Sequence, residues 1–152
     1  MRRVFLAFLI TLFITITSGM SYAAEDFEQK TESWGSLHCM VISWTSAAGG
    51  TFTSVPTEKI NGLVYYVLTD PDDEAAPSDN YDITLKNSNG YDIMGGKLAN
   101  RDEANTEVIQ PYDSTSGSYL AFPVDGALTL AISDMGNSTS GVIKIYFFAG
   151  GR

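Results

Sequence analysis

The sequence contains little of the chemistry on which catalytic and metal sites depend. It has one cysteine, Cys39, and one histidine, His38, among 152 residues. A single cysteine cannot form a disulfide within the chain, and two such ligands are too few for a zinc site. The two residues are adjacent on an expected strand, so their side chains point to opposite faces and cannot act as a nucleophile and its base. The sequence therefore predicts no catalytic residue, no bound cofactor and a protein that is not an enzyme.

Basic residues are also scarce. Nine Lys and Arg stand against eighteen Asp and Glu, which gives a formal net charge of −9. Nucleic acids and anionic lipids are bound by clustered Lys and Arg, so a surface of this charge repels both. The sequence therefore argues against a nucleic-acid partner and against membrane binding by the mature chain.

The one long apolar run lies at the N-terminus. Arg2 and Arg3 precede an apolar segment at 4–16, and Ser21-Tyr22-Ala23 is a small-x-small cleavage site. This pattern predicts a secretory signal peptide over residues 1–23 and export to the periplasm or the extracellular space. The apolar segment is shorter than the roughly 20 residues of a membrane span, and a retained anchor is the alternative. Cleavage leaves seven basic and eighteen acidic residues, a net charge of −11.

The rest of the chain has no sustained helical periodicity, and turn residues divide it into short apolar segments. Residues 24–36 are polar and acidic and are expected to form a flexible lead-in. Residues 37–150 are predicted to form one all-β domain, an antiparallel β-sandwich of Ig-like or jelly-roll-like shape with seven or eight strands. The expected strands cover 37–45, 63–68, 81–86, 91–94, 128–133 and 142–148, with short additions at 51–54 and 108–109.

Alternation along the strands predicts which side chains share a face. The residues expected on one face of their strands are Met40, Ile42 and Trp44 near the N-terminus, and Ile143, Ile145 and Phe147 near the C-terminus. Residues 63–68, LVYYVL, form an unbroken apolar run with β-branched and aromatic side chains. Such a run is typical of a strand that is covered on both faces.

A hairpin is expected around Asn87-Ser88-Asn89-Gly90, and its register can be derived. A two-residue turn sets Lys86 opposite Ile93, which mixes charged and apolar side chains on one face. A three-residue turn with Gly90 in the left-handed region sets Lys86 opposite Asp92 and Leu85 opposite Ile93. The second register is predicted, because a slip of one residue turns an apolar set toward water.

An acidic loop follows the apolar run and offers oxygen ligands. Calcium binds six to eight oxygens, and the candidate ligands are Asp70, Asp72, Asp73, Asp79 and Asp82. Their spacing does not match an EF-hand, because Pro71, Ala75 and Pro77 occupy positions that need ligands or glycine. A solvated turn with local backbone hydrogen bonds from Asp79 or Asn80 is the alternative interpretation.

Four aromatic residues lie in or near expected loops and are candidates for binding a sugar or a protein partner: Trp34, Tyr112, Tyr119 and Phe122. Burial of at least half of them is the alternative. Glycoside hydrolases use two carboxyl groups that face each other across the substrate, and Asp102, Glu103 and Glu107 are carboxylates close together in sequence. A single sequence does not show that two of them face each other. These three are therefore interpreted as surface charge.

Residues 37–148 resemble a group of small β-sandwich proteins encoded among the structural genes of tailed bacteriophages and prophages. The segments that carry the resemblance are AAPSDNYDITL, LANRDEANTE and GALTLAIS. The resemblance implies a virion-associated structural or accessory protein, such as a head-decoration or tail-associated module, with protein partners or self-assembly. It implies no catalytic residues.

Residues 1–23 depart from this pattern, because phage particles assemble in the cytoplasm and this segment directs export. A different interpretation fits an exported chain, namely a binding module for a glycan or a cell-surface protein. Its candidate contacts are the loop aromatics named above.

Overall fold

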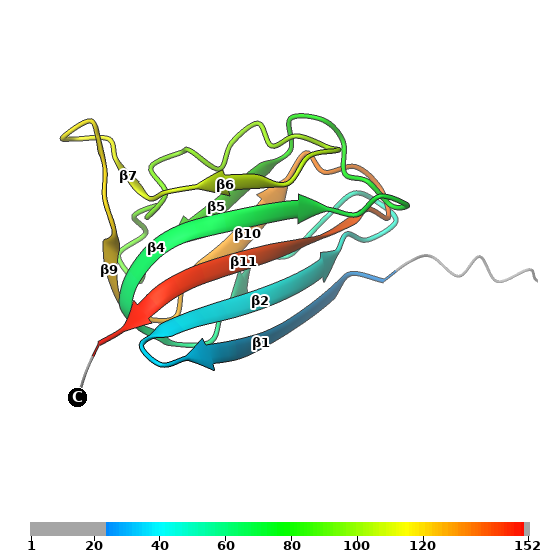
Figure 1. Ribbon diagram of the computed structural model, residues 1–152. Coiled ribbons are helices and arrows are strands. Elements are labelled where there is room, and N and C mark those ends of the chain that lie inside the picture. The colour runs from blue at the N-terminus through cyan, green and yellow to red at the C-terminus, as the bar shows by residue number, and fades with distance from the viewer. Residues whose placement is uncertain (1–23, 151–152) are drawn as a thin grey trace, which may run out of the picture.

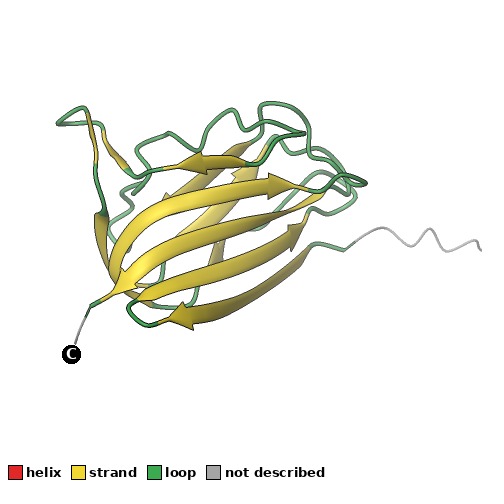
Figure 2. Ribbon diagram, in the orientation of Figure 1, coloured by secondary structure: helices red, strands yellow, loops and turns green. Residues whose placement is uncertain are grey.

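The computed structural model describes residues 24–150, and within them the chain is all-β, with eleven strands and no helix (Figure 2). The predicted signal peptide, residues 1–23, lies outside the described residues. Between residues 24 and 150 there is accordingly no apolar helix of membrane-spanning length. The all-β fold class predicted from the sequence is confirmed.

The strands follow one another with turns between them. In chain order they are β1 (Asp26–Trp34), β2 (Leu37–Thr45), β3 (Val55–Pro56), β4 (Ile60–Pro71), β5 (Asp82–Lys86), β6 (Glu107–Ile109), β7 (Tyr112–Asp113), β8 (Ser118–Tyr119), β9 (Phe122–Gly126), β10 (Thr129–Ser133) and β11 (Ser140–Ala149).

The strands form one large sheet and two smaller ones, and all pairs are antiparallel. The large sheet has the order β1-β2-β11-β4-β6, and β9 pairs with the same β4. The second sheet has the order β3-β10-β5, and β7 with β8 forms a two-stranded hairpin. In Figure 1 the large sheet curls in front of β5 and β10, so the two sheets enclose the interior.

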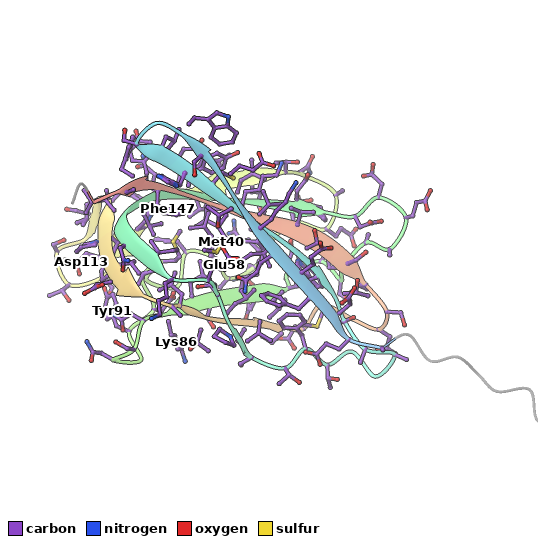
Figure 3. All side chains as sticks on the ribbon, turned by 90° about the horizontal axis from the view of Figure 1, so that it is seen from below. Met40, Glu58, Lys86, Tyr91, Asp113 and Phe147 are labelled. Atoms are coloured by element: carbon purple, nitrogen blue, oxygen red, sulfur yellow. The ribbon has the colours of Figure 1, made fainter. Side chains whose placement is uncertain are left out.

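The core lies between these two sheets. The large sheet contributes the residues predicted to share a face, Met40, Ile42 and Trp44 from β2 and Ile143, Ile145 and Phe147 from β11, and all are buried. The smaller sheet contributes Ile83, Leu85, Leu130 and Ile132, which are also buried. Each such side chain contributes about 1.5–3 kcal/mol to folding when it leaves water. Figure 3 shows Met40 and Phe147 on the inner side of the large sheet.

The hairpin register predicted from charge and burial is confirmed. Lys86 and Asp92 form an antiparallel bridge, and the amide of Ile93 donates to the carbonyl of Leu85 over 2.9 Å. Gly90 has a φ of 78°, the left-handed conformation that the three-residue turn requires. The expected strand at 91–94 is wrong beyond this single bridge, because the chain turns away through Gly95 and Gly96.

The predicted flexible lead-in is corrected by the structure, because most of it is strand β1. All nine residues of β1 pair with β2, from Asp26 opposite Thr45 to Trp34 opposite Leu37. Side chains of this region also bind the connection that follows β2: Thr31 Oγ1 donates to Glu58 Oε2 over 2.8 Å, and Glu25 accepts from the amide of Thr53. Backbone pairing and these polar contacts stabilise β1, although its sequence has no apolar alternation.

Two shorter segments also differ from expectation. The strand expected at 51–54 is absent, and the pairing residues are Val55 and Pro56, while Phe52 packs into the core from a loop. The segment 112–119, whose two tyrosines were expected in or near loops, is the β7–β8 hairpin. The hairpin lies in chain order between β6 and β9, which pair with different parts of the same edge of β4.

Candidate interaction surface

The large sheet has a second face that points away from the core, and we call it the outer sheet face. Alternation along each strand assigns its residues, because the neighbours of buried side chains must point outward. Pairing then aligns them in rows across the strands. One row at the end of the sheet is entirely apolar and consists of Trp34, Leu37, Phe148 and Leu63.

Several large apolar side chains of the outer sheet face are exposed to solvent. Their exposed fractions are 56% for Trp34, 46% for Leu63, 43% for Tyr65, 62% for Val108 and 40% for Phe148. Aromatic contacts connect the centre of the face. Tyr66 stacks on Tyr146 with 4.3 Å between ring centroids, and Tyr65 meets Phe148 edge to face at 5.8 Å. Single exposed apolar residues are ordinary, but a contiguous group on one face is typical of a contact surface.

This surface corrects the expectation that residues 63–68 are covered on both faces. Their inner side, at Val64 and Val67, is buried, whereas Leu63 and Tyr65 on the outer side are exposed. The outer sheet face was not predicted as a site from the sequence. The available signal was that three strands have apolar residues at both odd and even positions, as in VIKIYFF of β11. Only strand order shows that these second faces belong to one surface.

Charges on the outer sheet face occur in neighbouring rows. Glu32 lies in one row with Cys39, Tyr146 and Tyr66, and Lys30 lies in the next row with Val41, Lys144 and Leu68. Lys30 Nζ and Glu32 Oε1 are 3.1 Å apart, and both side chains are largely exposed. An exposed pair of this kind contributes under about 1 kcal/mol to stability, so its charges remain available to a partner.

The calcium candidates make hydrogen bonds to separate partners. Asp72 Oδ1 accepts the amides of Ala75 and Glu74, and the first of these bonds makes the largest contribution to lowering the pKa of that carboxyl. Asp82 accepts the amide of Asn100, and Asp79 accepts the side-chain amide of Asn80.

Of the remaining two candidates, Asp70 accepts the hydroxyl of Thr106 and Asp73 is exposed in the loop. Within residues 24–150 no group of three or more His, Cys, Asp or Glu is placed to hold a metal ion. The structure therefore does not bring the five candidates together.

His38 and Cys39 lie on opposite faces of β2, as predicted. The His38 ring stacks on the core residue Phe147 at 5.2 Å, and its Nδ1 is 2.8 Å from Ser33 Oγ on β1. Cys39 is buried on the outer side beneath Tyr146, and burial raises the pKa of its thiol. The Ser33 contact was not foreseen, because it depends on the β1–β2 pairing. Within the described residues no carboxylate binds the His38 ring, so the acid of a catalytic triad is not in place there.

The three carboxylates that were interpreted as surface charge make hydrogen bonds or ion pairs with neighbouring groups or lie exposed. Glu107 Oε2 is 3.2 Å from Arg101 and also accepts the amide of Asp102. Asp102 Oδ1 accepts the amides of Ala104 and Asn105, and the bond from Ala104 is the largest cause of the lowered pKa of Asp102. Glu103 is exposed in the same turn.

The structure brings two of the four candidate aromatics together. Tyr112 and Tyr119 pair across the β7–β8 hairpin with 5.0 Å between ring centroids, and Lys97 Nζ lies 4.4 Å from the centroid of Tyr112. Phe122 instead stacks on Tyr91 at 5.5 Å, and Trp34 lies on the outer sheet face.

An open groove of about 650 Å³ runs beside this tyrosine pair. Its lining residues are Lys97, Arg101, Glu107, Val108, Ile109, Gln110 and Tyr119. Aromatic, amide and charged groups thus meet in one depression next to the hairpin. This combination can stack on and hydrogen-bond to a polar ligand.

Comparisons with known proteins returned no match to a family model, to a curated protein or to a solved structure. Assignment of a function therefore depends on the surfaces described above.

Proposed function

We propose that the protein is a non-enzymatic structural or accessory module that contacts other proteins through the outer sheet face. The observation that supports this proposal is the apolar row on that face, in which Trp34, Leu63 and Phe148 are exposed, together with the exposed Tyr65 and Val108. Water-exposed apolar area of this extent is costly, and a partner that covers it gains about 25 cal/mol for each Å² buried.

The kind of assembly is taken from the sequence resemblance. A virion-associated role, as a head-decoration or tail-associated protein, agrees with a small all-β chain that presents a broad sheet face. In this proposal the two enclosing sheets are a β-sandwich of Ig-like or jelly-roll-like type, and residues 1–23 are a signal peptide for export. Because phage particles assemble in the cytoplasm, export and virion association are alternatives, and an exported chain serves its contact role in the cell envelope.

Co-sedimentation with particles tests the contact surface. Particles released from a host that carries the gene are purified with the wild-type chain, with Tyr65→Glu and with Tyr91→Glu. Tyr65 and Tyr91 have similar exposed fractions, 43% and 37%, but Tyr91 lies beside β5 in the other layer. We expect particles to carry the wild type and Tyr91→Glu and to lose Tyr65→Glu. A wild-type chain that never accompanies particles contradicts the virion role.

A serine-reactive phosphonate probe tests the non-enzymatic part of the proposal. Ser33 and His38 are the only hydroxyl and imidazole in hydrogen-bond contact within residues 24–150. We expect no more labelling of the wild type than of Ser33→Ala. Labelling that Ser33→Ala and His38→Ala both abolish would overturn the proposal and assign a nucleophile.

A second candidate function is glycan binding at the groove beside Tyr112 and Tyr119. The observation that favours it is the paired tyrosines with Lys97 over one ring, next to Gln110 and the Arg101–Glu107 pair. A glycan array with the wild type, Tyr112→Ala and Tyr119→Ala tests it. Binding that both substitutions reduce at least about tenfold supports the site, since stacking on one aromatic ring contributes roughly 1.4 kcal/mol.

A further inference from the structure

We infer that the groove beside the β7–β8 hairpin binds a sugar that carries a carboxylate, such as a hexuronate or a sialic acid. This inference rests on the second candidate function and names the class of glycan. The observation behind it is the position of Lys97, whose Nζ lies 4.4 Å from the ring centroid of Tyr112 and 6.0 Å from that of Tyr119. Neither of the two ion pairs found within the described residues includes Lys97, so it has no carboxylate partner there.

The other two charged side chains of the groove compensate each other. Arg101 Nη1 is 3.2 Å from Glu107 Oε2, and the remaining Arg101 nitrogens, Nε and Nη2, donate to the carbonyl of Ala99. Both groups therefore have fixed positions and opposite charges. The lining as a whole has one net positive charge, and this charge comes from Lys97.

Carboxylates also lie near the groove but outside its lining. Glu103 is exposed in the turn after Arg101. Other carboxylates accept a hydrogen bond from a backbone amide or a hydroxyl, which offsets part of their charge: Asp70, Asp82, Asp92, Asp102 and Asp113. Their field and the net charge of −11 after cleavage oppose an anion at a distance, although salt screens charges more than about 8 Å apart. We therefore expect a millimolar dissociation constant that depends on direct contact with Lys97.

The ring of Tyr119 offers the stacking surface. Tyr119 is 56% exposed, whereas the ammonium group of Lys97 lies over the ring of Tyr112. The hairpin is fixed against the turn that carries Lys97, because a Cβ at Gly95 would overlap the carbonyl oxygen of Tyr112. This close approach keeps the ammonium group and both rings together before a ligand arrives, which lowers the entropic cost of binding.

A sugar with a carboxylate satisfies all of these groups at once. Its apolar ring face packs on Tyr119, and its hydroxyls bond to the side-chain amide of Gln110, next to the end of β6. Its carboxylate accepts a charge-assisted hydrogen bond from Lys97, which is stronger than a bond between neutral groups. A neutral sugar makes the first two contacts and leaves the ammonium group without an anion. The groove therefore favours the acid over a neutral sugar with the same ring.

Chemical-shift titrations of the isotope-labelled protein test this inference, with ligand up to about 10 mM so that millimolar dissociation constants are measured. The ligands are trigalacturonate and sialyllactose, each as the free acid and as the methyl ester, which lacks the charge. The two acids distinguish a hexuronate from a sialic acid. We expect at least one acid to bind about tenfold more tightly than its ester and to shift the amide signals of Gln110 and Tyr119.

Substitutions at Lys97 test whether its charge is the cause of this preference. Lys97→Gln is expected to weaken binding of the acid about tenfold and to leave binding of the ester unchanged, whereas Lys97→Arg retains the preference. Lys59→Gln is the matched control, because it removes the same charge from an exposed lysine in the connection between β3 and β4. Unchanged dispersion of the amide spectrum shows that each variant is folded.

Equal affinity of the wild type for acid and ester overturns the inference, and so does an equal effect of Lys97→Gln and Lys59→Gln. If acid and ester bind equally and Tyr112→Ala and Tyr119→Ala reduce both, glycan binding at the groove stands while the acidic class fails. If neither acid nor ester shifts the amide signals of the groove, the acidic class fails, and the glycan array then decides whether neutral sugars bind there.

Discussion

Tyr66 of β4 and Tyr146 of β11 lie directly opposite each other in the large sheet and stack with 4.3 Å between ring centroids and 23° between ring planes. Neither ring points into the core, because Val67 and Ile145 beside them do. A stacked aromatic pair outside the core contributes about 0.5–1.5 kcal/mol to the sheet and presents a rigid apolar platform to the exterior. This platform is the centre of the outer sheet face.

Gly62 is predicted to be intolerant of any side chain. A Cβ at this position overlaps the backbone carbonyl of Phe148 on β11, and a paired backbone cannot move away. We expect Gly62→Ala to lower the free energy of unfolding by about 2–3 kcal/mol, as other overpacking substitutions do. Gly49→Ala is the matched control, since no atom lies within 4 Å of its Cβ, and its effect should stay within about 0.5 kcal/mol. Urea titration measures both, and equal values contradict the close approach.

Asp92 is predicted to stabilise the turn after β5. Its Oδ1 accepts the amide of Met94 over 3.1 Å and its Oδ2 accepts the amide of Gly96 over 2.7 Å. Asp92→Ala leaves these amides without their acceptors, and we expect a loss of about 1–3 kcal/mol. Asp73→Ala, which removes an exposed carboxylate of the acidic loop, serves as the control with little effect. Identical thermal midpoints for the two variants would count against this role of Asp92.

Tyr81 is predicted to make the fold sensitive to alkaline pH. Burial raises the pKa of its phenol to about 12, above the ordinary value of 10. The unfolded chain therefore loses this proton at lower pH than the folded chain, and stability falls between pH 10 and about 12. We expect Tyr81→Phe to reduce this fall by about 3 kcal/mol, because the rise from 10 to about 12 corresponds to about 1.4 kcal/mol for each pKa unit. Denaturant titrations at several pH values check it, and a slope that Tyr81→Phe leaves unchanged contradicts it.

The mature N-terminus is predicted to be Ala24. Expression of the full-length sequence in a secreting host should give a periplasmic or extracellular product that lacks residues 1–23, because the small-x-small site precedes Ala24. Intact-mass measurement of the product tests this directly. Recovery of uncleaved chain in the membrane fraction instead supports a retained anchor.

The sequence predicted those parts of the fold in which short-range pattern and burial agree. Met40, Ile42 and Trp44 alternate with outward residues, so their common face was readable without knowledge of the partner strands. The Lys86–Asp92 register was readable because two alternatives differ in whether charge or apolar surface is buried. In both cases residues that are close in sequence were sufficient for the prediction.

The remainder depends on contacts between distant segments. Strand β1 has no apolar alternation, and its order comes from pairing with β2 and from bonds to Glu58. The outer sheet face arises because β11 lies between β2 and β4, which a single sequence does not reveal. The Ser33–His38 contact and the tyrosine pair have the same origin. The acidic loop suggested a metal site by composition, whereas Asp72 accepts an amide of its own turn and Asp82 accepts the amide of Asn100.

Hydroxyl-radical footprinting of the protein with and without particles is the most direct test of the claim that a protein partner covers the outer sheet face. The account predicts that oxidation of Tyr65, Leu63 and Phe148 falls as particles are added, while oxidation of Tyr91 does not change. Equal oxidation of these residues under every condition, with and without particles, would contradict it.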